Sequence, residues 1–102
     1  MATKKETLDA LLSVLRDTDG ITARPMMGEY LLYIHGKLFG GLYDDRLLLK
    51  PTPGLRALLP DAPMKVPYDG AKPMLISEDW SRLPELLAAA ENELPEPNKK
   101  KA

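Results

Sequence analysis

The spacing of apolar positions changes several times along the chain, and each change predicts a new structural element. In the first stretch, leucines recur at helical spacing and form one apolar stripe, which predicts a helix over residues 4–17. The stripe consists of Leu8, Leu11, Leu12 and Leu15. Thr3 and Glu6 have the spacing of a capping box at the start of this helix, and Gly20 suits the positive φ that often follows a helix end.

The next stretch is rich in residues that favour strands and is divided by short turn signals. It predicts an antiparallel meander whose strands cover residues 30–34, 38–43 and 46–50. Between these strands lie His35 and Gly36, and then Asp44 and Asp45, each pair spaced as a two-residue hairpin loop. Residues 21–23 predict a further strand at the edge of the sheet.

The second half alternates helix and strand once more. Thr52 is placed to cap a short helix that Pro60 ends, and two short strands flank a turn at Asp69 and Gly70. Ser81 is placed to cap a last helix with a regular apolar stripe. That stripe consists of Leu83, Leu86, Leu87, Ala90 and Leu94.

These elements follow the order α–β(3-4)–α–β2–α, which predicts an α+β fold with a two-layer architecture and an antiparallel sheet. The 102 residues are enough for one domain with a real core. We expect a single domain over residues 1–94 and a disordered, lysine-containing tail over residues 95–102.

Two adjacent glycines, Gly40 and Gly41, interrupt a predicted strand, where glycine is normally unfavourable. A phosphate-binding loop does not explain them, because Lys37 precedes the pair and a strand follows it. With two-residue hairpin loops, Leu31 lies opposite Gly40, and Gly40 lies opposite Leu49. We therefore predict that Gly40 faces the core and lets a helix approach the sheet closely.

The same register divides the sheet into two faces of different character. The face that we expect to form the core carries Leu31, Tyr33, Leu38, Gly40, Leu42, Leu47 and Leu49. The other mixes aromatic and basic side chains, and its candidate partner-binding residues are Tyr30, Lys37, Phe39, Tyr43, Arg46 and Lys50. Such a face can stack bases and hold phosphates, or associate with a protein or a second copy of the chain. Cross-strand stabilisation of the sheet explains the same pattern.

Candidate catalytic groups are few. The chain has no cysteine, and its one histidine, His35, falls in a predicted hairpin loop. A zinc site needs more ligands than one histidine, and Asp44 with Asp45 lacks the other oxygen ligands of a calcium loop. None of the serines has a base partner at a plausible spacing. We predict no catalytic, cofactor-binding or metal-binding residues.

Composition and charge match an ordinary soluble domain, with 44% apolar residues, 28% charged residues and a net charge of −1. No apolar run approaches the roughly 20 residues of a membrane span, and the first residues lack the apolar core of a signal peptide. We expect a cytoplasmic protein that does not bind membranes.

One segment, RPMMGEYLLYIHGKLFGGLYDDRLLLKP continued by PYDGAKPML, resembles the N-terminal domain of the TfoX (Sxy) family of bacterial competence regulators. The resemblance covers residues 22–75, with Met27 where phenylalanine is common in the family. The matching positions are Arg24, Met27, Gly28, Tyr33, Gly36, Phe39, Gly40, Leu47, Leu49 and Lys50. It implies a two-layer α+β fold that resembles secretion chaperones. Well-known members carry a second, helix-rich domain and promote transcription of DNA-uptake genes together with a cyclic-AMP receptor protein.

From residues and resemblance together, we expect a non-enzymatic regulatory or binding module linked to competence-type transcriptional regulation. Its partner would be a protein or a nucleic acid, and a homodimer is compatible with the sequence. The alternative is a small-ligand-binding protein or an enzyme that uses the glycine-lined face of the sheet. A concave site with convergent polar groups would favour that alternative, and a flat mixed face would favour the binding module.

Overall fold

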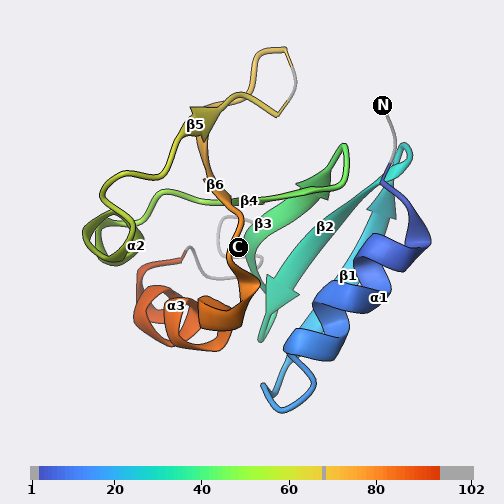
Figure 1. Cartoon of the computed structure of the whole chain (residues 1–102), viewed down its shortest axis with the longest axis horizontal. Coiled ribbons are helices and arrows are strands. Elements are labelled where there is room, and N and C mark those ends of the chain that lie inside the picture. Colours follow the sequence, from blue (N-terminus) through green and yellow to red (C-terminus); the bar gives the residue numbers. More distant parts are fainter. Residues whose placement is uncertain (1–2, 68, 95–102) are drawn as a thin grey trace, which may run out of the picture.

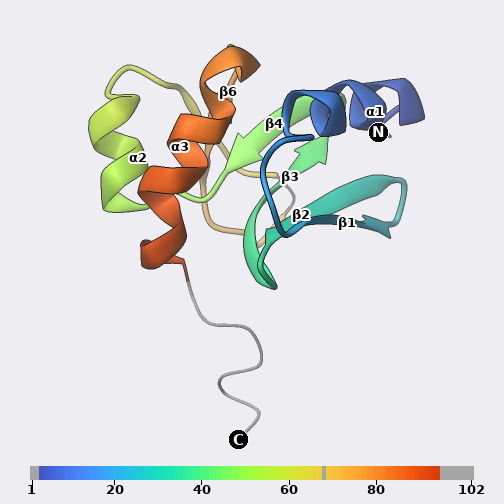
Figure 2. The same cartoon turned by 90° about the horizontal axis from the view of Figure 1, so that it is seen from below.

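The computed structural model has an α+β fold in which an antiparallel sheet of six strands carries three α-helices (Figures 1 and 2). It describes residues 3–67 and 69–94. The α-helices are α1 (Lys5–Val14), α2 (Pro53–Leu58) and α3 (Leu83–Ala90), and the 3-10 helices are η1 (Trp80–Arg82) and η2 (Glu91–Glu93). The strands are β1 (Ile21–Met26), β2 (Glu29–Ile34), β3 (Lys37–Tyr43), β4 (Arg46–Leu49), β5 (Met64–Lys65) and β6 (Met74–Ser77). The predicted α+β class is confirmed.

The strands lie in the order β1-β2-β3-β4-β6-β5, and every neighbouring pair is antiparallel. The first four strands are joined by two-residue loops whose residues all have positive φ, as tight hairpins require. These loops are residues 27–28, 35–36 and 44–45. The first of them was not predicted, and β1 runs on through Pro25, which an edge strand tolerates.

The predicted capping box of the first helix is wrong. Lys4 is the N-cap residue and makes no side-chain cap, while the Thr3 hydroxyl donates to Oε1 of Glu29 at 2.7 Å. Asp45, from the turn between β3 and β4, accepts hydrogen bonds from the Lys4 N–H at 2.9 Å and from the Thr7 hydroxyl at 2.8 Å. A residue distant in sequence therefore caps α1, which no local pattern could indicate.

The predicted register between β2 and β3 holds next to the hairpin loop, where Tyr33 pairs with Leu38, and is off by one residue beyond that pair. Leu32, not Leu31, pairs with Gly40, because the pairing shifts between Leu32 and Tyr33. Such a bulge adds one residue to one strand and changes which side chains share a face. The register between β3 and β4 is as predicted, with Gly40 opposite Leu49.

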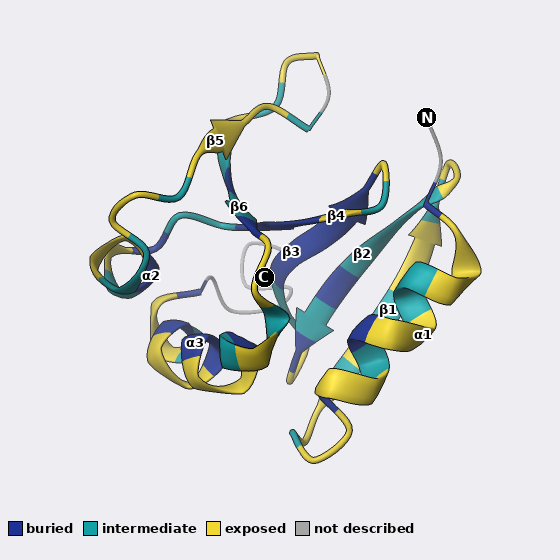
Figure 3. Cartoon of the chain, viewed as in Figure 1, coloured by how far each residue is buried: buried dark blue, intermediate teal, exposed yellow. Residues whose placement is uncertain are grey.

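The shifted register places the even-numbered residues of β2 toward the helices. Leu32 and Ile34 are buried there, and Phe39 joins them with no exposed surface. Leu31, Tyr33 and Leu38, which were predicted to face the core, lie outside the buried cluster and are half-buried. Figure 3 shows that β2 carries both buried and intermediate positions. The helices contribute Leu11, Leu15, Leu55, Leu83, Leu86, Leu87 and Ala90 to the core, and the sheet contributes Leu32, Ile34, Phe39, Leu42, Leu47, Leu49 and Leu75.

Gly40 is required for a different reason from the one predicted. A Cβ atom at this position would collide with the carbonyl oxygen of Leu48 on β4, so the absent side chain admits a neighbouring strand rather than a helix. At Gly41 a Cβ would lie 2.7 Å from Cε2 of Tyr43 and 2.8 Å from the Tyr30 carbonyl oxygen. The Tyr43 ring thus occupies the space that Gly41 leaves.

Two further expectations concern the ends of the chain and membranes. The tail predicted over residues 95–102 lies outside the described residues, and the domain boundary at residue 94 stays a prediction. Within the described part of the chain, no helix has the length and apolar character that a membrane crossing demands.

Candidate functional site

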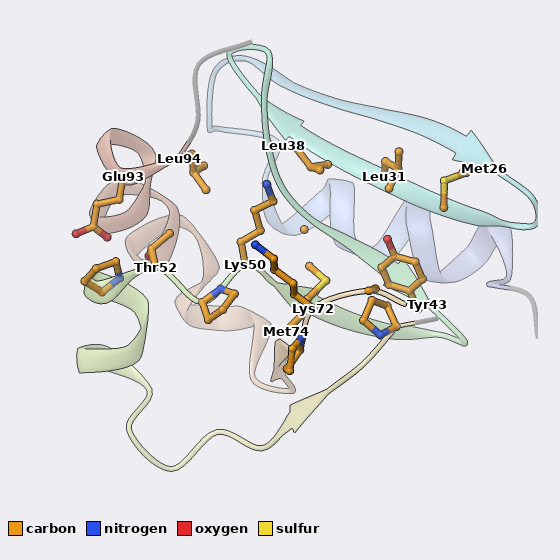
Figure 4. Close-up of a pocket in the computed structure, with 16 residues that line it drawn as sticks. Met26, Leu31, Leu38, Tyr43, Lys50, Thr52, Lys72, Met74, Glu93 and Leu94 are labelled. Carbon is orange, nitrogen blue, oxygen red and sulfur yellow. The ribbon is translucent and has the colours of Figure 1, made fainter. Parts of the chain in front are cut away.

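A groove of about 600 Å³ opens beside β2 and β3, between these strands and the segment that joins β5 to β6 (Figure 4). Its strand residues are Met26, Leu31, Leu38, Gly40 and Tyr43. The segment after β4 contributes Lys50, Pro51, Thr52 and Pro53, and the segment around β6 contributes Pro67, Ala71, Lys72, Pro73 and Met74. Glu93 and Leu94 close one end. We call this cavity the groove.

The floor of the groove is apolar because the bulge turns the odd-numbered residues of β2 away from the helices. Leu31 and Leu38 lie there, half-buried, and Met26 extends the apolar surface from the end of β1. Figure 4 shows these three side chains along one side, with Lys50, Lys72 and Met74 facing them. A ligand that enters the groove therefore meets apolar surface on one side, and Met74 with two lysines on the other.

Two lysines contribute positive charge, and each is followed by a proline. A residue before proline is restricted to extended backbone, so Lys50 and Lys72 are held in this conformation by Pro51 and Pro73. The Lys50 backbone N–H also donates to the Phe39 carbonyl at 2.9 Å, which ties it to the bulged part of β3. No hydrogen bond or ion pair joins either ammonium group to any of the residues that the structure describes.

The end of the groove near α2 is occupied by structural hydrogen bonds. Oε1 of Glu93 accepts from the Gly54 N–H at 2.8 Å, and the Thr52 hydroxyl accepts from the Leu55 N–H at 3.2 Å. These bonds satisfy N–H groups in the first turn of α2, as the sequence predicted for Thr52. The carboxylate that lines the groove is therefore committed to the fold.

The six residues predicted to share one partner-binding face do not do so. Tyr43 and Lys50 line the groove, while Arg46 is exposed and lines a smaller cavity of about 210 Å³ near Trp80. The other three lie on the side of the helices. Phe39 is fully buried, Tyr30 packs against the core, and Nζ of Lys37 donates to the Glu91 carbonyl at 3.1 Å. The bulge in β3 is the reason, because it moves Phe39 and Lys37 to the core face.

Most of the groove was not predicted from the sequence. Leu31 and Leu38 were predicted to lie in the core, and no role was predicted for Lys72 or Met26. The signal that was available is the repeated Lys-Pro pair, at residues 50–51 and 72–73. It indicates two lysines with restricted backbones, but not that the fold brings them to one cavity.

Outside the groove, two carboxylates with a lowered pKa stabilise the starts of helices. The Lys4 backbone N–H and then the Thr7 hydroxyl lower the pKa of Asp45. The Ser81 hydroxyl, at 2.6 Å, and the Ser81 N–H lower the pKa of Asp79. Asp79 is thus the N-cap of η1, and Ser81, which was predicted to cap the last helix, lies within η1. The described residues contain no group of three or more His, Asp or Glu side chains that could hold a metal ion.

Comparison with known proteins identifies a family and a similar protein. Residues 13–96 match the TfoX N-terminal domain. The chain is also similar to a Spirochaeta aurantia protein described as an uncharacterized 12.7 kDa protein in the trpE 5′ region. The two are 38% identical over 81 residues, which is 76% of this chain and 70% of the relative. No solved structure matches the chain.

Proposed function

Because the chain belongs to the TfoX N-terminal domain family, we propose that it is a non-enzymatic regulatory module that binds a protein partner through the groove. In this proposal the module contributes to transcriptional regulation of the competence type, as the resemblance to competence regulators implies. The observation that carries the proposal is the groove itself, an open apolar cavity on a sheet whose other face is covered by helices. Apolar surface that stays accessible beside charged residues is typical of interaction sites.

Binding fits the lining of the groove better than catalysis does. A catalytic site brings together acids and bases whose pKa values are shifted toward their task. Here the two carboxylates with a clearly lowered pKa in the described part of the chain, Asp45 and Asp79, lie outside the groove and cap helices. Glu93 is held by the Gly54 N–H.

The placement of the aromatic residues favours a protein over a nucleic acid. Nucleic-acid binding on a sheet uses exposed aromatic rings on which bases stack. Phe39 is fully buried, and Tyr43 is only 9% exposed beside Gly41. An apolar groove with half-buried Leu31 and Leu38 instead suits apolar side chains of a partner. A second copy of this chain is one form that the partner can take.

To test the proposal, the purified full chain is used as bait to capture partners from an extract of the native cell. The capture is carried out with and without nuclease treatment of the extract. The groove variant carries Leu31→Gln and Leu38→Gln. The matched control carries Ala57→Gln and Ala88→Gln, at exposed positions of α2 and α3. Thermal melts followed by circular dichroism establish that both variants fold.

We expect a nuclease-resistant partner that the wild-type chain and the helix control retain and that the groove variant loses. A partner that nuclease removes would contradict the choice of protein. A partner that the groove variant retains would contradict the choice of surface. Sedimentation of the purified chain decides whether a second copy is the partner, because self-association must then also be lost in the groove variant.

A further inference from the structure

We propose that the groove is a binding site for a small amphiphilic carboxylate, meaning an apolar body that carries one carboxylate group. The inference rests on the proposed function only in placing the working surface at the groove, and it needs no protein partner. It would make the module responsive to a small molecule. Three observations carry it: the size of the cavity, its largely apolar lining, and two lysines whose ammonium groups have no hydrogen-bond or ion-pair partner among the described residues.

The cavity has the size and lining of a small-molecule site. Its volume of about 600 Å³ falls within the range of roughly 300 to 1,000 Å³ that is typical of such sites. Leu31 and Leu38 keep accessible surface on one wall, and Met74 faces them from β6. Removing this apolar surface from water favours a ligand with an apolar body. Methionine also adapts to ligands of varied shape, and Met26 and Met74 both line the groove.

The positive charges of the groove favour a ligand with an anionic head group. Lys50 and Lys72 line the same cavity, and neither ammonium group has a partner among residues 3–67 and 69–94. The carboxylate of Glu93 is the acidic group of the lining, and it accepts from the Gly54 N–H at 2.8 Å. Two positive charges beside one committed negative charge leave an excess of one positive charge, which one carboxylate neutralises.

The lysines are also partly preorganised. Each precedes a proline, which restricts its backbone to extended conformations, and the Lys50 N–H is bonded to the Phe39 carbonyl. Order that exists before binding lowers the entropy lost when a ligand binds. Each ammonium group ends a flexible four-carbon stem, so both lysines can turn toward a head group from their shared side of the groove.

Other occupants fit this chemistry less well. A polyphosphate binds best where several backbone N–H groups are unsatisfied, but in the first turn of α2 Glu93 and Thr52 occupy those of Gly54 and Leu55. Residues 95–102 follow Leu94, which lines the groove, but their sequence carries three lysines that Lys50 and Lys72 would repel. A carboxylate on an apolar body matches both the apolar lining of the groove and its excess of positive charge.

The test uses a pair of probes that differ only in the head group. Sodium octanoate and 1-octanol share a heptyl chain, which ends in a carboxylate in octanoate and in a hydroxymethyl group in octanol, so only octanoate carries a charge. We titrate each into the isotopically labelled full chain and follow the backbone amide and methionine methyl signals. We expect saturable shifts centred on Met26, Leu31, Leu38 and Met74, with octanoate bound about tenfold more tightly than octanol, as one charge-assisted contact warrants.

The second arm removes the two charges. Lys50→Met with Lys72→Met keeps the apolar stems, and we expect octanoate affinity to fall about tenfold while octanol affinity stays nearly unchanged. The matched control, Lys5→Met with Lys65→Met, removes two exposed lysines outside the groove. It should bind octanoate as the wild type does. If the variant with both Lys50→Met and Lys72→Met does not fold, octanoate affinity is measured on Lys72→Met alone. Lys72 is exposed, so its replacement leaves the core intact.

Several results would overturn the inference. These are an absence of saturable shifts, equal affinity for the two probes, an equal loss of octanoate affinity in the control variant, or shifts confined to the helices. Because the titration uses the purified chain alone, its failure would leave the captured protein partner standing. In the same way, octanoate binding would stand if no protein partner were captured.

Discussion

At Gly40 the absent side chain leaves room for the backbone of a neighbouring strand. The pairing of β2 with β3 shifts next to this residue, and a Cβ atom there would meet the Leu48 carbonyl oxygen of β4. Backbone held in a sheet cannot move aside as the end of a flexible side chain can. The requirement for glycine at this position is therefore steric, and it arises from the bulge.

We expect Gly40→Ala to lower the free energy of unfolding by about 1–3 kcal/mol, the usual cost of forcing extra atoms into a packed site. Urea denaturation measures the loss. Gly54→Ala is the comparison, because its Cβ would lie 2.9 Å from Oε1 of the Glu93 side chain and 3.2 Å from the Ala89 carbonyl oxygen, which are looser contacts than the collision at Gly40. Equal losses in the two variants would show that the backbone contact at Gly40 does not decide its cost.

Among elements, the start of α1 is held by the turn between β3 and β4. Asp45 accepts from the Lys4 N–H and the Thr7 hydroxyl, and its own N–H donates to the Thr3 hydroxyl at 3.1 Å. The Thr3 N–H in turn donates to the Gly28 carbonyl in the turn between β1 and β2. One end of the helix is thus attached to two hairpins, which fixes its position over the sheet.

The lowered pKa of Asp45 predicts how stability depends on pH. A carboxylate whose pKa is lower in the folded state stabilises the fold above its unfolded value of 3.8, and this contribution is lost as pH falls through the folded pKa. Asp45→Asn should therefore be less stable than wild type at pH 7, and the difference should shrink below pH 3.8. Urea midpoints across this range measure it.

Asp44→Asn is the control for this prediction. Asp44 also has positive φ in the same turn, and its side chain is exposed. Asparagine tolerates this backbone conformation as aspartate does. If Asp44→Asn and Asp45→Asn changed stability alike at both ends of the pH range, the cap on α1 would not be the cause.

In the molecule as a whole, contacts at the C-terminal end of α3 join the helices to the sheet and to the groove. Nδ1 of His35 and Oε2 of Glu91 are 2.6 Å apart, and Lys37 donates to the Glu91 carbonyl. Leu94 follows η2, is 5% exposed, belongs to the core cluster and lines the groove. This end of the chain therefore supports the core and the candidate site together.

We expect a chain that ends after Leu94 to melt within about 2 °C of the full chain, because the sequence of residues 95–102 has no large apolar residue to anchor it. Leu94→Ala in the full chain should instead lower the free energy of unfolding by about 2 kcal/mol, the lower end for a buried leucine. Calorimetry of both proteins compares them. A large loss on truncation would mean that residues 95–102 contribute to the fold.

The sequence by itself determined the elements whose signals are local. The leucine stripes predicted the first and last helices, the loops at residues 35–36 and 44–45 predicted hairpins, and together they indicated the α+β class. The motif around Gly36, Phe39 and Gly40 was enough to recognise the family. These features depend on neighbouring residues, so they can be read without knowing the rest of the chain.

The tertiary structure alone decided which residues share a surface. A bulge of one residue exchanges the two faces of a strand, so it moved Phe39 into the core and Leu31 into the groove. The cap that Asp45 provides and the meeting of Lys50 with Lys72 join residues far apart in sequence. No periodicity or spacing in the sequence encodes such contacts. They arise only after elements that are distant in sequence have packed against the sheet.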